Sequence, residues 1–376
     1  LVVFVIAYAV VMAEEFTHLR KSKPVVLEAG LIWGMIAIAY SNTPHYEMVE
    51  HEIRHSFLEY TELAFFLLVA MTYINALEER NVFNSLKSWL IKNQFSYRQL
   101  FWITGVLAFF LSPLADNLTT ALVLCAVVVA VGSSSPKFVG LACVNIVVAA
   151  NAGGAFSPFG DITTLMVWQA GQLDFLQFFA LVIPSVVNYI IPASIMHFFV
   201  SDHKPDVAET SVTIKYGGKT IILLGLLTIV TAVSFHNFLH LPPVFGMMTG
   251  LAYLQLYSFY IKISVKDIEE QKYDFFENVA RVEWDTLLFF FGVILSVGGL
   301  GFIGYLEYVS EFMYTDLGAT TANVLVGILS AIVDNIPVMF AVLTMEPAMP
   351  DSQWLLVTLT AVSYTHLTLP TSCCGE

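Results

Sequence analysis

Apolar runs of membrane-spanning length recur along the whole chain, and two of them are interrupted by the same polar motif. Of the 376 residues, 57% are hydrophobic and only 12% are charged, whereas a soluble globular chain has about 25% charged residues. The runs are continuous and do not alternate, so they predict helices and not the strands of a barrel. We therefore expect an all-α polytopic protein whose surroundings are the lipid bilayer. The net charge of −14 is not that of a nucleic-acid-binding protein.

Hydropathy along the chain defines the candidate spans. They are 1–13, 25–40, 60–77, 101–131, 138–152, 154–170, 175–200, 220–236, 243–261, 284–306, 321–345 and 353–361. The first and last are too short to cross, so we expect clipped spans and a chain truncated at its C-terminus. Residues 362–376 are polar and resemble the translated end of a sequencing adapter, so we leave them out of the functional interpretation; the alternative is a natural tail.

The basic residues are distributed unevenly between the connecting segments. The loops 41–59, 237–242 and 307–320 together hold only Arg54, whereas the other long connections hold several Lys and Arg. Cytoplasmic loops carry the excess of basic residues, so the basic segments are assigned to the cytoplasm. With this orientation the interrupted run 101–131 must enter and return from the cytoplasmic side, and 321–345 from the outside.

The two interrupted runs share a motif. SPLADNLTTALVL (112–124) and SAIVDNIPVMFAV (330–342) both contain Ser-x-x-x-Asp-Asn at the break. Each follows an aromatic-rich helix with an acid near its start, Glu62 or Asp285. Two repeats of opposite membrane orientation are typical of secondary transporters, and paired interruptions point to their binding site.

The repeat divides the chain into successive parts. We expect a clipped N-terminal helix and cytoplasmic loop over 1–24, a first repeat over 25–200, a cytoplasmic linker over 201–219, and an incomplete second repeat over 220–361. The first repeat contains the hairpin 101–131 and a broken helix over 138–170. The second repeat contains the hairpin 321–345.

The hairpin tips carry groups suited to a cation. An Asp at the centre of a membrane helix costs roughly 2.5–3.5 kcal/mol on insertion scales, so two in matching places indicate function. Carboxylate, amide and hydroxyl oxygens suit a hard cation, and the same carboxylate can instead take a proton. We therefore predict a site that holds a hard cation and H⁺ alternately, built from Asp116, Asn117, Ser330, Asp334 and Asn335. The alternative is that each Asp-Asn pair only caps the following half-helix, and the two roles can coexist.

A third polar element is VVAANAGGAFSPFGDITTLMVWQAG (147–171). Its Gly and Pro residues break a helix, Asn151 ends one arm, and Asp161 begins the next with Thr164 on the same face. These side chains add oxygen ligands to the predicted site. The alternative is an outside loop in which Asp161 is an ordinary N-cap.

Three further residues are accessory candidates with an open alternative. Glu62 and Asp285 lie near the ends of spans, where a solvated position is equally compatible with the sequence. His55 lies in the acidic stretch EHEIRHSFLE; a pH-sensing role is conceivable because histidine titrates near neutral pH, but a solvated surface is favoured.

These motifs closely resemble the NhaD family of sodium/proton antiporters, part of the ion transporter superfamily that includes arsenite and dicarboxylate carriers. The similarity is carried by AMTYINALEERNVFNSL, LSPLADNLTTALVL, NAGGAFSPFGDITTLMVWQAG, EWDTLLFFFGVILSVGGLGFIGYLE and SAIVDNIPVMFAVLTM. It extends to about Ala361. The family also has a Ser- and Gly-rich broken helix after the second hairpin, and this chain has the adapter-like tail in its place.

The resemblance implies an activity and an assembly. It implies exchange of cytoplasmic Na⁺, often also Li⁺, for outside H⁺ across the bacterial inner membrane, with no cofactor and no enzymatic reaction. It implies a homodimer with a scaffold and a mobile, elevator-like transport domain. It also adds Thr163 to the site residues and supports Asp116, Asn117, Asn151, Asp161 and Thr164, as well as Glu62 and His55 as further polar positions.

Three other functions can be weighed against the residues. An anion carrier on the same fold is disfavoured because carboxylates repel anions and the spans hold no Lys or Arg. An intramembrane protease would need a nucleophile with a base or a metal cluster, and neither occurs. A passive channel is disfavoured by the repeated hairpins.

Overall fold

The computed structural model describes residues 1–93, 95–132, 135–204, 212–264 and 273–363, and every regular element in these ranges is a helix. Eight of the helical segments are long and apolar enough to cross a membrane. They are Ser22–Tyr40, Tyr46–Glu79, Tyr97–Ala115, Pro136–Gly154, Phe175–His197, Gly218–Leu239, Pro243–Ser264 and Trp284–Phe302. The prediction of an all-α polytopic membrane protein is therefore confirmed for the described residues.

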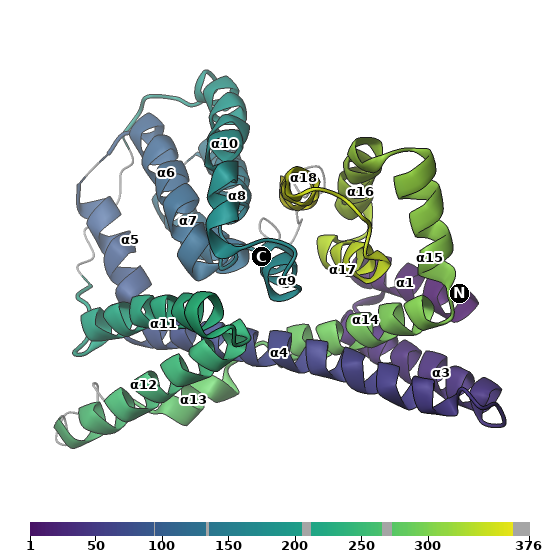
Figure 1. Cartoon of the computed structure of the whole chain (residues 1–376). Helices are drawn as coiled ribbons and strands as arrows, with labels where there is room; N and C mark the ends of the chain where they lie inside the picture. The colour runs from purple at the N-terminus through teal and green to yellow at the C-terminus, as the bar shows by residue number, and fades with distance from the viewer. Residues whose placement is uncertain (94, 133–134, 205–211, 265–272, 364–376) are drawn as a thin grey trace.

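A layer of long helices supports two separate helical groups (Figure 1). The layer consists of α3 (Ser22–Tyr40), α4 (Tyr46–Glu79), α11 (Gly218–Leu239), α12 (Pro243–Ser264) and α14 (Trp284–Phe302). One group holds α5 (Val82–Lys92), α6 (Tyr97–Ala115), α7 (Asn117–Val131), α8 (Pro136–Gly154) and α10 (Val182–His197). The other holds α1 (Val2–Met12), α15 (Tyr305–Ser310), α16 (Ala319–Ile332), α17 (Asn335–Met345) and α18 (Asp351–Ser363). The short helix α9 (Ile162–Gln169) lies between the groups (Figure 1).

The first interrupted run forms a hairpin. Its first arm α6 begins with a capping box in which Ser96 and Gln99 bond each other's backbone N–H. The ring of Tyr97 stacks on Phe138 at 4.3 Å between centroids, and Gly132, just after the second arm α7, lies against the same Phe138 ring. Both ends of the run therefore meet, and Asp116 lies at the tip between the arms.

The second interrupted run returns in the same way. Asn323, in the second turn of α16, donates its amide N–H to the sulfur of Met349 at 3.7 Å and to Gln353 Oε1 at 3.0 Å. Met349 lies just beyond the end of α17, so the start of one arm meets the end of the other. Asp334 lies at the tip between α16 and α17.

Three sequence-based assignments of secondary structure are wrong. The loop predicted over 41–59 is helical from Tyr46 onwards, because Glu, Arg and His are acceptable helix residues and Arg54 pairs with Glu50 one turn away at 2.7 Å. The loop predicted over 307–320 is mostly α15 and a π-helical segment, Glu311–Asp316. The span predicted over 154–170 contains only the eight residues of α9, about 12 Å of helix, which is too short to cross.

The predicted tail lies largely outside the described residues. Helix α18 runs to Ser363 and so includes the first two residues of the predicted tail, and Val362 is fully buried. The remainder of that prediction, 364–376, lies outside the residues that the structure describes.

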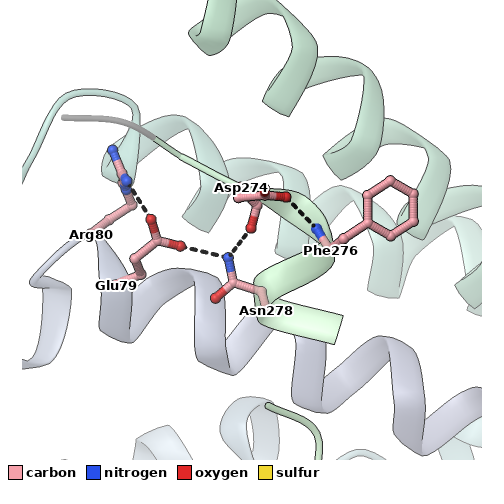
Figure 2. A network of polar contacts seen from close by, with 5 residues as sticks. All are labelled: Glu79, Arg80, Asp274, Phe276 and Asn278. Atoms are coloured by element: carbon pink, nitrogen blue, oxygen red, sulfur yellow. Dashed lines mark hydrogen bonds and ion pairs between the residues drawn. The ribbon is translucent and has the colours of Figure 1, made fainter. Parts of the chain in front are cut away.

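A buried polar network joins the end of α4 to α13 (Phe275–Ala280) (Figure 2). Arg80 is fully buried and pairs with Glu79 at 2.6 Å. Asn278 donates to the other oxygen of Glu79 at 2.6 Å, and Asp274 caps α13 by accepting from the N–H of Phe276 at 2.9 Å. The sequence placed Arg80 among ordinary loop cations; here it is a packing residue that fixes α13.

The Arg80 guanidinium also lies over the ring of Tyr273, 4.9 Å from its centroid. Burial raises the pKa of Tyr273, so its phenol stays neutral across the physiological range. The cation therefore faces an uncharged aromatic ring and pairs with the carboxylate of Glu79.

Candidate functional site

Three aspartates begin three helices and line one cavity of about 420 Å³. Asp116 is the N-cap of α7, Asp161 of α9 and Asp334 of α17. Asp116 and Asp334 come from the two hairpin tips, which lie far apart in sequence and share this cavity. Asp116 and Asp334 are the two aspartates of the repeated motif, and Asp161 comes from the separate glycine-rich element.

Asp116 holds a backbone conformation that the tip requires. Its φ is +59°, in the left-handed region that Asp tolerates better than most residues. Its Oδ1 accepts the N–H of Leu118 at 2.7 Å and its Oδ2 accepts the hydroxyl of Thr119 at 2.8 Å. The capping role is therefore real, and the half-buried carboxylate still lines the cavity.

Asn117 links the first tip to the broken helix. Its amide Nδ2 donates to Asp161 Oδ2 at 2.6 Å, and its Oδ1 accepts the hydroxyl of Ser112. Gly154, at the end of α8, lies so close to Asn117 Oδ1 that a Cβ at this position would clash with it. The glycine-rich stretch is therefore needed for close packing, and Asn117 positions Asp161 without itself lining the cavity.

Asp334 has a cationic neighbour that the sequence did not predict. The Nζ of Lys21 lies 3.6 Å from Asp334 Oδ2 and 3.9 Å from Glu14 Oε2. The sequence predicts Lys21 in the cytoplasmic loop within 1–24, outside every span. A lysine from outside the spans therefore reaches the site, although the predicted spans themselves hold no Lys or Arg.

Asp285 belongs to the same cavity. Its Oδ1 accepts the hydroxyl of Ser22, the first residue of α3, so α14 and α3 are joined at the cavity rim. The sequence left Asp285 either as an accessory site residue or as a solvated residue near the end of its span. The structure places it in the lining of the aspartate cavity.

The remaining predicted site residues do not line the cavity. Thr163 donates its hydroxyl to Asp161 Oδ1 at 2.6 Å and so acts through that carboxylate. Thr164 donates to the carbonyls of Ser157 and Asp161, and Ser330 donates to the carbonyl of Gly327 at 2.7 Å. Asn151 lies in the last turn of α8 and Asn335 is the first residue of α17.

Glu62 and His55 line a different cavity, also of about 420 Å³. Other acids there are Glu52, Glu59 and Glu346. His55 is about half exposed, with its Nδ1 3.9 Å from Glu59 Oε2, which fits the solvated interpretation of this histidine.

The two cavities lie at opposite ends of the same helices. On α4, Glu62 and Leu63 line the second cavity, whereas Phe66 and the residues after it line the first. Helices α9, α14 and α17 likewise contribute one end to each cavity. Buried side chains separate the two: Leu63, Phe66, Leu165 and Met166.

The aspartate cavity is acidic. Its lining includes six carboxylates and two basic side chains: Glu14, Asp116, Asp161, Glu283, Asp285 and Asp334, with Lys21 and Arg281. Such a surface attracts cations and repels anions. Among the described residues, no three His, Cys, Asp or Glu side chains are close enough to hold one metal ion together. The three aspartates therefore share the cavity without forming one coordination shell.

Sequence reasoning missed two charged residues, Lys21 and Glu28. Glu28 is the single acid in the apolar stretch VVLEAGLIWGMIAIAY of α3, and an isolated charge in such a run is a usable signal. The position of Lys21 gave no signal, because it lies at the end of an ordinary basic segment.

The helical fold, the membrane-length apolar segments and the acidic cavity define a polytopic transporter. The similarity of the chain to known proteins agrees with this class. The chain belongs to the citrate transporter family (CitMHS), whose profile matches residues 1–362.

Within that group the chain belongs to the NhaD family. It is 54% identical to the Na⁺/H⁺ antiporter NhaD of Vibrio cholerae serotype O1, over 96% of this chain and 80% of that protein. It is 52% identical to the Na⁺/H⁺ antiporter NhaD of Alkalimonas amylolytica, over 96% and 79%. A more distant relative is sodium/proton antiporter 1 of Arabidopsis thaliana, 31% identical over 91% of this chain and 59% of that protein.

Proposed function

We propose that this protein exchanges Na⁺, and also Li⁺, for H⁺ across the cytoplasmic membrane of a bacterium and so contributes to pH homeostasis. The observation that carries the proposal is that Asp116, Asp161 and Asp334 line one and the same acidic cavity. The names of the NhaD relatives support the same ions. The competing function, an anion carrier, would place its substrate among six carboxylates.

Exchange follows from competition for the same oxygens. A carboxylate in a site of low polarity favours its neutral form, whereas a bound cation favours the ionised form. Na⁺ and H⁺ therefore exclude one another on Asp116, Asp161 and Asp334. Asn117 and Thr163 keep Asp161 oriented through bonds of 2.6 Å each, so the carboxylate does not reorient when its charge changes.

Transport also requires that the ion-binding site open to each side of the membrane in turn. The aspartate cavity is rimmed by Lys21, Arg281 and Glu283, from segments that the positive-inside rule assigns to the cytoplasm. We propose that the structure represents the state open to the cytoplasm. The second cavity, lined by Glu62 and His55, is then the outer vestibule from which H⁺ arrives.

We further propose that the two hairpins belong to inverted repeats and move as an elevator against the layer of long helices, within a homodimer. The shared Ser-x-x-x-Asp-Asn motif at the two tips supports the repeat. Rigid-body movement of the hairpin groups would carry the tip aspartates from one opening to the other. Disulfide cross-links between hairpin and layer that stop exchange reversibly would test the movement, and cross-linking in native membranes would test the dimer.

The central test is Asp116→Asn in everted membrane vesicles. Asparagine is also a good N-cap, so α7 keeps its start while the titratable group is lost. We expect Na⁺-dependent proton movement to fall to background. Asp274→Asn is the matched control, because Asp274 also caps a helix, accepting from Phe276 N–H at 2.9 Å, but does not line the cavity. Full exchange by a well-expressed Asp116→Asn protein would remove Asp116 from the mechanism.

A further inference from the structure

Glu28 is a buried acid without a hydrogen-bond partner. Its side chain, in the middle of α3, is 1% exposed, and neither carboxylate oxygen has a hydrogen-bond partner among the described residues. Only one other charged residue in the described part of the chain is buried to this extent, Arg80, and Arg80 has an ion pair with Glu79. Glu28 therefore differs from Arg80, the buried charged residue that serves packing, because Glu28 has no ion pair among the described residues.

An ionised carboxylate is strongly disfavoured in this place. Moving an unpaired charge out of water costs far more than a lost hydrogen bond, and a group in that position neutralises instead. A membrane-spanning helix makes the penalty greater, because lipid supplies no water or counter-charge. Some bound species must cancel the charge of Glu28.

The groups around Glu28 are neutral hydroxyls from two other helices. The hydroxyl of Ser296 on α14 lies within interaction distance of the carboxylate, although its geometry is not that of a formed hydrogen bond. Tyr8 is on α1, which packs against α3, and it lies close enough to Glu28 and Asp334 to interact with both electrostatically. The hydroxyls of Tyr8 and Ser296 are themselves buried and without a hydrogen-bond partner among the described residues. Three unsatisfied polar groups thus gather in one apolar region.

The charged groups near this cluster do not neutralise Glu28. No charged side chain, of α4 or of any other helix, is among the groups that act on Glu28. From α14 the facing group is the uncharged Ser296. No ion pair with Glu28 is present among the described residues, in contrast to Asp334 and its Lys21.

We infer that Glu28 is a second proton-binding site, separate from the aspartate cavity, in which a protonated carboxyl is surrounded by the hydroxyls of Tyr8 and Ser296. A metal ion fits less well, because hard cations take about six or more oxygen ligands. The buried side-chain oxygens without a hydrogen-bond partner that gather here among the described residues are two from Glu28 and one each from Tyr8 and Ser296. The backbone carbonyls of α3 and α14 are used within unbroken helices.

The assignment goes beyond the proposed function and does not depend on it. Glu28 lies outside the cavity that the metal ion would enter. A proton held there is not displaced directly by Na⁺, and because α3 belongs to the layer of long helices, it stays in place in the proposed movement of the hairpins.

Infrared spectroscopy of the purified protein tests the assignment without requiring transport. At neutral pH the wild-type protein should show a protonated carboxyl C=O band that Glu28→Gln lacks. Glu47→Gln, which changes an exposed glutamate of α4, should keep the band. If Glu28→Gln does not fold, Glu28→Asp should shift the band in frequency. Identical spectra for wild type and both Glu28 variants would overturn the assignment.

Adding NaCl separates a proton site from a metal site. The Glu28 band should persist in saturating Na⁺, and also in Asp116→Asn. Loss of this band on Na⁺ addition would mean that Glu28 binds the metal ion, which contradicts the assignment. Failure of the proposed function has a different signature: wild-type vesicles would then show no Na⁺-dependent proton movement, whatever the infrared spectra show.

Discussion

Each of the three cavity aspartates uses its oxygens for helix capping as well as facing the cavity. Asp116 accepts from the N–H of Leu118, Asp161 from the N–H of Thr163 and Asp334 from the N–H of Ile336. The positive end of a helix stabilises a carboxylate in its ionised form. The caps therefore reduce the cost of holding three acids close together when no proton or metal is bound.

Lys21 is predicted to compete with Na⁺ for Asp334. Its ammonium lies 3.6 Å from Asp334 Oδ2, where a transported cation would also bind. Lys21→Gln should lower the Na⁺ concentration for half-maximal exchange. The pair is partly exposed and such pairs are worth up to about 1 kcal/mol, so the change should be at most about fivefold.

The matched control is Lys23→Gln, which removes an exposed lysine from the same segment and should leave the Na⁺ dependence unchanged. An unaltered or weaker Na⁺ dependence in Lys21→Gln would show that Lys21 does not compete.

Gly154 is predicted to be required for the position of Asn117. An alanine Cβ would meet Asn117 Oδ1 and push the amide away from Asp161. Overpacking of this kind costs about 1–3 kcal/mol, and exchange should fall at least tenfold in vesicle assays. Gly140→Ala on the same helix has open space around its Cβ, so it should be active and slightly more stable. Wild-type exchange by Gly154→Ala would remove the Asn117–Asp161 bond from the mechanism.

Among the elements, short helices that start in mid-protein determine the site. Helices α7, α9 and α17 each begin at an aspartate that lines the same cavity. Breaking a helix exposes N–H groups that a continuous span would use internally. The site is therefore assembled from helix ends, whereas the long helices around it supply support and lipid contact.

The junction of α4 and α13 is predicted to contribute to stability. Asn278 is fully buried and donates to Glu79 Oε2 at 2.6 Å (Figure 2). Asn278→Ala leaves that oxygen without its donor, which costs about 1–3 kcal/mol. The melting temperature of the purified protein should fall accordingly. Arg54→Gln, which breaks the exposed pair with Glu50, should change it little, and an equal effect in both variants would contradict this role for Asn278.

At the scale of the whole molecule, two cavities approach each other from opposite ends of four helices. Leu63 and Phe66, one helical turn apart on α4, line different cavities. The separation is therefore a thin layer of buried apolar side chains. Coupled exchange depends on this layer, because a continuous water path would let protons cross without Na⁺.

Phe66→Ala is predicted to open such a path. Phe66 is 2% exposed and packs against Phe159 at 5.5 Å between ring centroids. Its truncation leaves a cavity, costs about 3–5 kcal/mol, and should cause proton leakage in proteoliposomes without Na⁺. Phe65→Ala, at an exposed neighbouring position, should not cause proton leakage. A Phe66→Ala protein that exchanges ions without proton leakage would show that the barrier to protons lies elsewhere.

The sequence by itself determined the helical membrane fold, the two breaks and the aspartate at each break. These properties depend on local chemistry: a long apolar run must form a helix in lipid, and an Asp in the middle of one marks an interruption. The capping role of Asp116 and Asp334 follows from the same local rules. The extent of α4 was missed because hydropathy reports where a helix is apolar, not where it ends.

Only the tertiary structure decided which of the polar residues face the cavity. Thr164 and Ser330 bond to nearby carbonyls, Asn117 holds Asp161, and Lys21 reaches Asp334 from outside the spans. The isolation of Glu28 also depends on what α1 and α14 place around it. The physical reason is that a side chain's partners come from segments far away in the sequence, and spacing along one helix does not contain that information.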